Sequence, residues 1–386
     1  MALDNKYLKL IEFIKTLYPN MDTIPLHAPV FKGNEKEYLD DCIKTSFVSY
    51  VGKYVSKFEE MTTKYTGSKY AIAVVNGTVA LQVAMQLAGV KPQDEVITQP
   101  LTFVATANAI AHVGATPVFV DVDSDTLGMS PDKLDDFLNQ NTKWEKKTEK
   151  LINLSSSRPI SAIVPMHTFG HPCRIDEITE IAEKYGIPVI EDSAESLGSF
   201  YKGKHTGTFG QAGVISYNGN KTITTGGGGM ILTDDEDLAR KIKHITTTAK
   251  IPHQWEYVHD EIAYNYRLTN VNAAIGVAQM EKIDAMLANK ASIAEKYALF
   301  CNENDIKFFD QPVNARSNYW LNAILLSDKR ERDDFLRYTN ENGIITRPIW
   351  KLMNKLEMYK KCLHGDLSNA ESLENKIVNI PSGANL

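Results

Sequence analysis

From residue 70 to about residue 232, short apolar runs with strand character alternate with segments whose apolar residues recur at helical spacing. Ala71–Val75, Glu95–Thr98 and Ile187–Glu191 have strand character, whereas Thr78–Ala88 and Ile175–Tyr185 show the helical pattern. This alternation is typical of a parallel sheet with helices on both faces, because parallel strands are joined by crossover connections. The chain is therefore predicted to contain a large α/β domain.

Two departures from this pattern predict how the chain is organised. Between Leu138 and Pro159 the sequence is polar and lacks a core face, which predicts a solvated excursion from the domain. A helical segment over Leu268–Leu287, continued by Lys290–Phe300, separates the α/β domain from a smaller C-terminal unit that has a strand at Asn318–Leu325. We expect a large domain at 31–267, a small α+β domain at 268–386, and an N-terminal segment, 1–30, that packs with the small domain.

Composition excludes several classes of function. A net charge of -6 gives no electrostatic basis for binding nucleic acid or an anionic membrane. The four cysteines are far apart and form no C-x-x-C pair, which favours reduced thiols over a disulfide framework or a zinc site. With no apolar stretch of membrane-spanning length and no apolar signal core at the N-terminus, the protein is expected to be cytoplasmic.

Residues that follow the strands are the first candidates for a site, since ligands bind beyond the carboxyl ends of an open parallel sheet. Asn76-Gly77-Thr78 follows the first strand and opens a helix, so its backbone N–H groups favour a phosphate, although a simple turn is the alternative. Ser216 ends another apolar run, and its hydroxyl is placed to reach the same phosphate, unless it is an ordinary strand serine.

Lys221 and Asp192 are the candidate catalytic residues. Lys221 lies just before the glycines 226–229, which let the backbone approach closely, and a shielded lysine can form a Schiff base. Asp192 follows an apolar strand, where a carboxylate needs a cation such as the ring nitrogen of pyridoxal 5'-phosphate (PLP). A surface lysine and a helix N-cap are the respective alternatives.

One phenylalanine and two histidines are further candidates for the site. Phe103 begins a helix and is placed to stack on a planar ring, or else belongs to the core. His167 and His171 have metal-ligand spacing, but Gly170 and Pro172 indicate a loop, and so we predict no metal site there. His167 is instead expected to line the pocket at a strand end. The absence of G-x-G-x-x-G after the first strand argues against a Rossmann oxidoreductase.

Nearly the whole chain resembles the sugar-nucleotide aminotransferases of fold type I, which use PLP. The motifs that carry this resemblance are Ile24-Pro-Leu-His, Tyr50-Val-Gly-Lys-Tyr-Val-Ser-Lys-Phe-Glu, Val75-Asn-Gly-Thr-Val-Ala-Leu, Glu191-Asp-Ser-Ala-Glu-Ser-Leu-Gly, Ser216 through Gly229, Tyr264-Asn-Tyr-Arg-Leu-Thr-Asn and Thr346-Arg-Pro-Ile-Trp. The resemblance implies a fold type I aminotransferase, with a large, mostly parallel-sheet PLP domain and a smaller C-terminal α+β domain.

The resemblance also implies roles for individual residues. Lys221 would bind the cofactor covalently, Asp192 would pair with its ring nitrogen, and the phosphate would be held by Gly77, Thr78 and Ser216. Asn265 would reach the cofactor phosphate of a neighbouring subunit, which implies a homodimer with shared active sites. Glu195 stands where many relatives carry glutamine or histidine near the ring hydroxyl, and Arg347 would bind an anionic group of a substrate unless it forms a surface ion pair.

Within this family the chain looks most like the enzymes that transfer an amino group from L-glutamate to C4 of UDP-2-acetamido-4-keto-6-deoxyglucose, in the bacillosamine and legionaminic acid routes to bacterial surface glycans. The motifs behind this prediction are His205-Thr-Gly-Thr-Phe-Gly, Asn218-Gly-Asn-Lys, Thr246-Thr-Thr-Ala-Lys and Trp255-Glu-Tyr-Val-His-Asp-Glu. The alternatives are a C3 aminotransferase of a dTDP-linked keto sugar, a GDP-perosamine-type C4 aminotransferase, and a noncatalytic PLP-binding regulator. The intact Lys221 and Asp192 count against the regulator.

Overall fold

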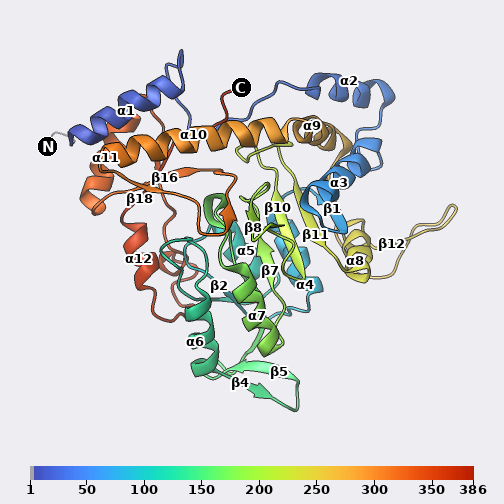
Figure 1. The fold of residues 1–386 in the computed structure, drawn as a ribbon. Helices are drawn as coiled ribbons and strands as arrows, with labels where there is room; N and C mark the ends of the chain where they lie inside the picture. The colour runs from blue at the N-terminus through green and yellow to red at the C-terminus, as the bar shows by residue number, and fades with distance from the viewer. Residues whose placement is uncertain (1–3) are drawn as a thin grey trace.

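Two sheets lie edge to edge at the centre of the computed structural model, which describes residues 4–386 (Figure 1). The strand order in the first sheet is β1 (Tyr70–Val74), β11 (Gly229–Thr233), β10 (Ala212–Ser216) and β7 (Ile190–Asp192). The order in the second is β3 (Thr116–Phe119), β2 (Glu95–Thr98), β6 (Pro159–Val164), β5 (Lys150–Asn153) and β4 (Thr142–Glu145). Parallel bridges from Ile163 to Val189 and from Met166 to Asp192 join the sheets.

The pairing within these sheets is mixed. β10 and β7 are parallel, as are β2 and each of its neighbours, which confirms the predicted α/β architecture. β11 runs antiparallel to both β1 and β10. Because β11 is antiparallel, its first residue, Gly229, lies beside Val74 and Ser216 at the ends of β1 and β10.

Helices cover both faces of the first sheet, because alternate side chains of each strand point to opposite sides. Ile72 and Val74 face one side, where they pack with α4 (Gly77–Leu87), α5 (Val104–His112) and α8 (Glu236–Thr246). Ala71 and Ala73 face the other side, where the helices are α2 (Glu35–Thr45), α3 (Lys53–Thr66) and α9 (Asn270–Met280). The second sheet packs against α6 (Pro131–Asn141) and α7 (Ile175–Tyr185).

The predicted solvated excursion between Leu138 and Pro159 is wrong, because β4 and β5 form an antiparallel hairpin that extends the sheet. Leu151 is buried, and the buried Asn153 donates from Nδ2 to Glu95 Oε2 at 2.7 Å. A polar residue therefore occupies a core position with its own partner, so that the hydrophobic pattern alone does not reveal the strand.

The C-terminal unit is built on an antiparallel sheet with the strand order β14 (Lys307–Phe309), β16 (Asn322–Leu325), β18 (Ile377–Ile380) and β17 (Arg347–Pro348). Its helices are α10 (Ile283–Glu303), α11 (Lys329–Glu341) and α12 (Ser368–Glu374). The predicted helix over Leu268–Leu287 is divided, because the backbone of Lys282 leaves the helical conformation between α9 and α10. The predicted strand at Asn318–Leu325 begins at Asn322, since the residues before it turn toward the pocket described below.

Helix α1 (Asn5–Leu17) packs in one hydrophobic cluster with residues of α10, α11 and β16, including Tyr297, Phe335 and Ile324. This contact agrees with the place expected for the N-terminal segment, although the domain boundaries at 30/31 and 267/268 stay predictions. Among residues 4–386, every helix is too short or too polar to cross a membrane.

Candidate active site

A pocket of about 320 Å³ lies at the carboxyl ends of β1, β7 and β10. It brings together seven of the ten residues predicted from the sequence, namely Gly77, Thr78, Phe103, Asp192, Glu195, Ser216 and Lys221. The other three, His167, Asn265 and Arg347, do not line it. Strand ends that are far apart in the sequence thus meet in one cavity.

The start of α4 forms one wall of this pocket. Asn76 caps the helix, since its Oδ1 accepts the N–H of Val79 at 2.9 Å. The first N–H groups of a helix have no partner within it, and the helix dipole favours an anion there. A Cβ on Gly77 would lie 3.1 Å from the Cβ of Ser216, and a Cβ on Gly229 would lie 2.5 Å from the backbone oxygen of Asn76. Glycine at both positions therefore keeps this wall open and close-packed, as a phosphate cradle requires.

Asp192 lies inside the pocket with uncharged donors. The hydroxyl of Thr106 donates to its Oδ2 at 2.6 Å, and the N–H of Ala194 donates to its Oδ1 at 3.1 Å. Burial raises the pKa of Asp192, because the ionised form loses its hydration. A protonated ring nitrogen would supply the missing positive charge, so this carboxylate fits PLP.

Lys221 Nζ is held between a carboxylate and an aromatic ring. It lies 3.2 Å from Glu195 Oε1 and 3.9 Å from the centre of the Trp320 ring. The Lys221 side chain is 12% exposed, whereas that of Glu195 is 1% exposed. Burial raises the pKa of Glu195 to about 7 despite the nearby ammonium group. The lysine is accessible from the pocket but largely shielded, which suits covalent capture of an aldehyde.

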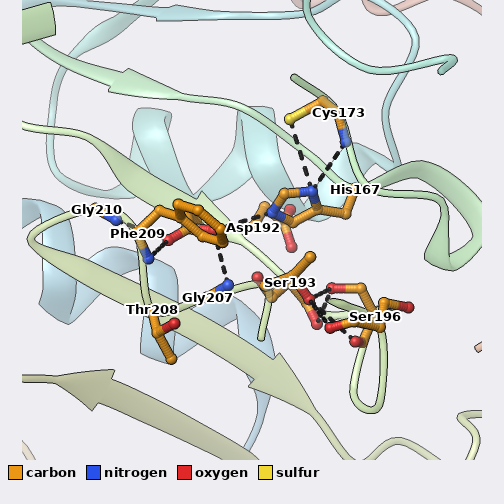
Figure 2. A network of polar contacts seen from close by, with 12 residues as sticks. His167, Cys173, Asp192, Ser193, Ser196, Gly207, Thr208, Phe209 and Gly210 are labelled. Atoms are coloured by element: carbon orange, nitrogen blue, oxygen red, sulfur yellow. Dashed lines mark hydrogen bonds and ion pairs between the residues drawn. The ribbon is translucent and has the colours of Figure 1, made fainter. Parts of the chain in front are cut away.

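A network on the other side of β7 fixes the strand that carries Asp192. Because neighbouring strand residues face opposite ways, Glu191 points away from the pocket, where it accepts the N–H groups of Gly207, Phe209 and Gly210 at 2.6–2.7 Å. Figure 2 shows Gly207, Phe209 and Gly210 together with His167, Cys173 and Asp192. The carboxylate thereby ties the loop after β9 (Lys204–His205) to the strand that presents Asp192.

His167 belongs to this network and not to the pocket wall, contrary to the expectation that it lines the pocket. It is fully buried, and its Nδ1 accepts the N–H of Cys173 at 3.2 Å. Nε2 must therefore carry the hydrogen, and it donates to Glu191 Oε2 at 3.1 Å. Because both ring nitrogens form hydrogen bonds, His167 supports β7 from the side opposite the pocket.

Arg347 and Asn265 lie outside the pocket. Arg347 is exposed, and its Nη1 donates to Asn340 Oδ1 at 2.9 Å and to the backbone oxygen of Thr346 at 2.8 Å. Asn265 is also exposed, and its backbone pairs with that of Thr247 at the base of the hairpin formed by β12 (Lys250–Ile251) and β13 (Val258–His259). The roles proposed for both residues depend on groups beyond this single chain.

Several residues that the sequence did not single out complete the pocket. Trp320 and Trp350 come from the C-terminal unit, and the indole N–H of Trp320 donates to the backbone oxygen of Asn220 at 2.7 Å. The Phe103 ring, which is 48% exposed, lies 6.2 Å from that of Trp350. No local pattern marks Trp320, because its contact with Asn220 depends on packing between two separate parts of the chain, whereas Trp350 ends the motif Thr346-Arg-Pro-Ile-Trp.

Comparisons with known proteins agree with this geometry. The model of a family described as the DegT/DnrJ/EryC1/StrS aminotransferase family matches residues 29–386. GDP-perosamine synthase of Escherichia coli O157:H7 is 37% identical over 94% of each chain, and that of Caulobacter vibrioides is 35% identical over 95% of each. The crystal structure of the aminotransferase TlmJ from Streptoalloteichus hindustanus matches with a TM-score of 0.84 at 26% identity, covering 93% of each chain.

Proposed function

Since the chain belongs to the DegT/DnrJ/EryC1/StrS aminotransferase family, and is thus a PLP-dependent sugar aminotransferase, we propose that it transfers an amino group from L-glutamate to C4 of a GDP-linked 4-keto-6-deoxyhexose. The observation that carries the proposed chemistry is the meeting of Lys221, Asp192 and the start of α4 in one pocket. The product would be a GDP-linked 4-amino sugar for bacterial surface glycans.

The choice of the GDP-linked sugar over the UDP-linked sugar rests on two arguments. The first is the similarity to two GDP-perosamine synthases over nearly the whole chain. The second is the position of one motif that favoured UDP, because the His205–Gly210 loop binds Glu191 on the side of the sheet opposite the pocket. Of the four motifs, the segment 218–221 lines the pocket, and its lysine is required whichever nucleotide is bound.

Each residue of the pocket has its own proposed role in the reaction. When bound, PLP supplies an aldehyde that accepts the amino group and a ring that withdraws electrons from the reacting carbon. Lys221 would hold the aldehyde covalently and, once released, would move the proton at the α-carbon of the donor and later at C4 of the sugar. Asp192 would keep the ring nitrogen protonated, while Gly77, Thr78 and Ser216 would bind the phosphate. The Trp320 ring shields Lys221 Nζ, which lies 3.9 Å from its centre, and Phe103 would stack on the cofactor ring.

The assembly we propose is a homodimer in which each subunit completes the other's site. Exposed apolar side chains gather on 43–51, where Ile43, Phe47 and Val51 are 59–68% exposed. A second group lies on the hairpin after α8, which extends away from the body of the chain and carries Trp255 and Tyr257 (Figure 1). Asn265 lies at the base of that hairpin. Burial of these surfaces against a second copy would place Asn265 near the partner's phosphate cradle.

The test is amination by the purified protein with PLP and L-glutamate. GDP-, UDP- and dTDP-linked keto sugars are supplied separately, and NMR locates the new amine. We expect amination at C4 of the GDP-linked sugar and no product with Lys221→Ala. Amination of the UDP- or dTDP-linked sugar alone, or amination at C3, would refute this substrate.

A further inference from the structure

The pocket holds more buried negative charge than positive charge. Asp192 and Glu195 both enter it from the end of β7, and Lys221 is the cation that faces them. When Lys221 becomes a neutral amine, Glu195 loses its ionic partner. A buried carboxylate in that position is costly unless it takes up a proton.

Glu195 is held so that one oxygen faces Lys221. Its Oε2 accepts the N–H of Phe169 at 2.9 Å, and Phe169 adopts a left-handed backbone conformation with a φ of 57°. Nδ2 of Asn318 donates to the backbone oxygen of Glu195 at 2.8 Å. Strained backbone of this kind persists where the surrounding contacts fix it. The remaining oxygen, Oε1, is thus presented to Lys221 Nζ at 3.2 Å.

We propose that Glu195 is a catalytic acid–base partner of Lys221, exchanging a proton between Oε1 and Nζ each time the lysine is captured or released; this rests on the proposed function of the site. In the forward direction an N–H bond of the ammonium group breaks and an O–H bond forms on Glu195. The lone pair left on Nζ then bonds to the aldehyde carbon, and the aldehyde oxygen leaves as water with the two hydrogens that remain on Nζ. On release of the lysine, the proton returns. The exchange needs no other reactant.

The charges around Glu195 favour this exchange. Burial and the carboxylate of Asp192 raise the pKa of Glu195, while the ammonium of Lys221 lowers it, and the result is about 7. Two histidines also interact with these charges: burial raises the pKa of Asp192 while His167 lowers it, and burial, Lys290 and Lys221 lower the pKa of the half-buried His27. A pKa near neutrality is the value at which a carboxyl group both accepts and returns a proton readily.

The experiment measures how fast the full-length protein, stripped of cofactor, captures PLP at pH 5.5–9. Internal proton transfer gives the wild type a capture rate that rises to pH about 7 and then levels off, since Glu195 is ionised above its pKa of about 7 and can accept the proton. In Glu195→Gln, Lys221 must lose its proton to solvent. We expect its rate to be at least tenfold lower at pH 7 and to keep rising about tenfold per pH unit.

One control variant and the behaviour of the wild type keep the outcomes distinct. Glu35→Gln removes another buried carboxylate, which accepts the N–H of Gly33 at 2.9 Å and does not line the pocket, and it should retain the wild-type profile. If Glu195→Gln has the wild-type profile, or is faster at pH 7 because Glu195 merely stabilises the ammonium group, the proposal is overturned. A wild type that captures no PLP would instead overturn the proposed function.

A measurement on the wild type covers the case in which Glu195→Gln does not fold. Infrared difference spectra recorded as PLP binds should show the carbonyl band of a new carboxylic acid, because Glu195 takes the proton from Lys221. The band should shift when all glutamates carry carbon-13. Covalent binding of PLP without this band would contradict the proposal.

Discussion

Replacing Asp192 by asparagine is expected to stabilise the cofactor-free protein and to weaken PLP binding. Asp192 is 2% exposed, and its two hydrogen-bond donors, Thr106 and Ala194, are uncharged. Burial raises the pKa of Asp192 above the ordinary value of 3.8. An acid whose pKa is raised by folding destabilises the fold above that raised pKa, and the effect disappears as the pH falls below 3.8. The cost of the buried charge therefore grows as the pH rises above 3.8, and the wild type carries it at neutral pH.

Asparagine fits the same contacts. Its oxygen accepts the N–H of Ala194, and its amide faces the Thr106 hydroxyl, which can turn to donate to Thr102 Oγ1 at 2.7 Å. Removing the uncompensated charge should raise the free energy of unfolding by about 1–3 kcal/mol. The lost pairing with the ring nitrogen is worth about 1.5–3 kcal/mol, and so PLP affinity should fall roughly 10- to 150-fold.

Urea unfolding of the cofactor-free proteins at pH 7 and fluorescence titration with PLP measure the two effects. Asp121→Asn is the matched control, because Asp121 is equally buried but accepts the N–H groups of Asn369 and Ala370, both at 2.9 Å. That variant should be less stable than the wild type, since one amide cannot accept both bonds. A cofactor-free Asp192→Asn protein that is less stable than the wild type, or that binds PLP with unchanged affinity, would refute the reasoning.

Three further substitutions test other parts of the account. Gly229→Ala places a methyl group against the backbone of Asn76, and this overpacking should cost about 1–3 kcal/mol. Because Asn76 must shift and it belongs to the pocket wall, PLP binding measured by equilibrium dialysis should be weaker. Burial lowers the pKa of Lys290 to about 7, so wild-type stability should rise between pH 7 and 10, and Lys290→Met should abolish that rise in urea unfolding. Glu191→Gln should lower the free energy of unfolding by about 2–4 kcal/mol in the same assay. A decrease below 0.5 kcal/mol would contradict the claim that Glu191 stabilises β7.

The part of the site that the sequence predicted depends on strand ends. Asn76, Asp192 and Ser216 each end a recognisable apolar run, and the strands of one sheet bring their ends together. The α/β architecture could be predicted because it, too, depends on apolar runs that the sequence shows. The antiparallel direction of β11 could not be predicted, because an apolar run has the same composition in either direction.

The rest of the site depends on long-range packing. The contact of Lys221 with Glu195 and Trp320 requires the loop after β7 and the turn before β16 to meet, which no local spacing encodes. His167 was misplaced because its strand end predicts proximity to the pocket but not the direction of its ring. The short motifs around His205 mark a loop that braces the sheet, and so they report the fold more than the substrate.

The central claim is that Lys221 is the residue that binds PLP covalently. Borohydride reduction of the PLP-loaded protein followed by peptide mass spectrometry tests it directly. The account predicts that the reduced cofactor is attached to the peptide containing Lys221 and that Lys221→Ala carries no label. Cofactor attached at another lysine, or no attachment in the wild type, would contradict it.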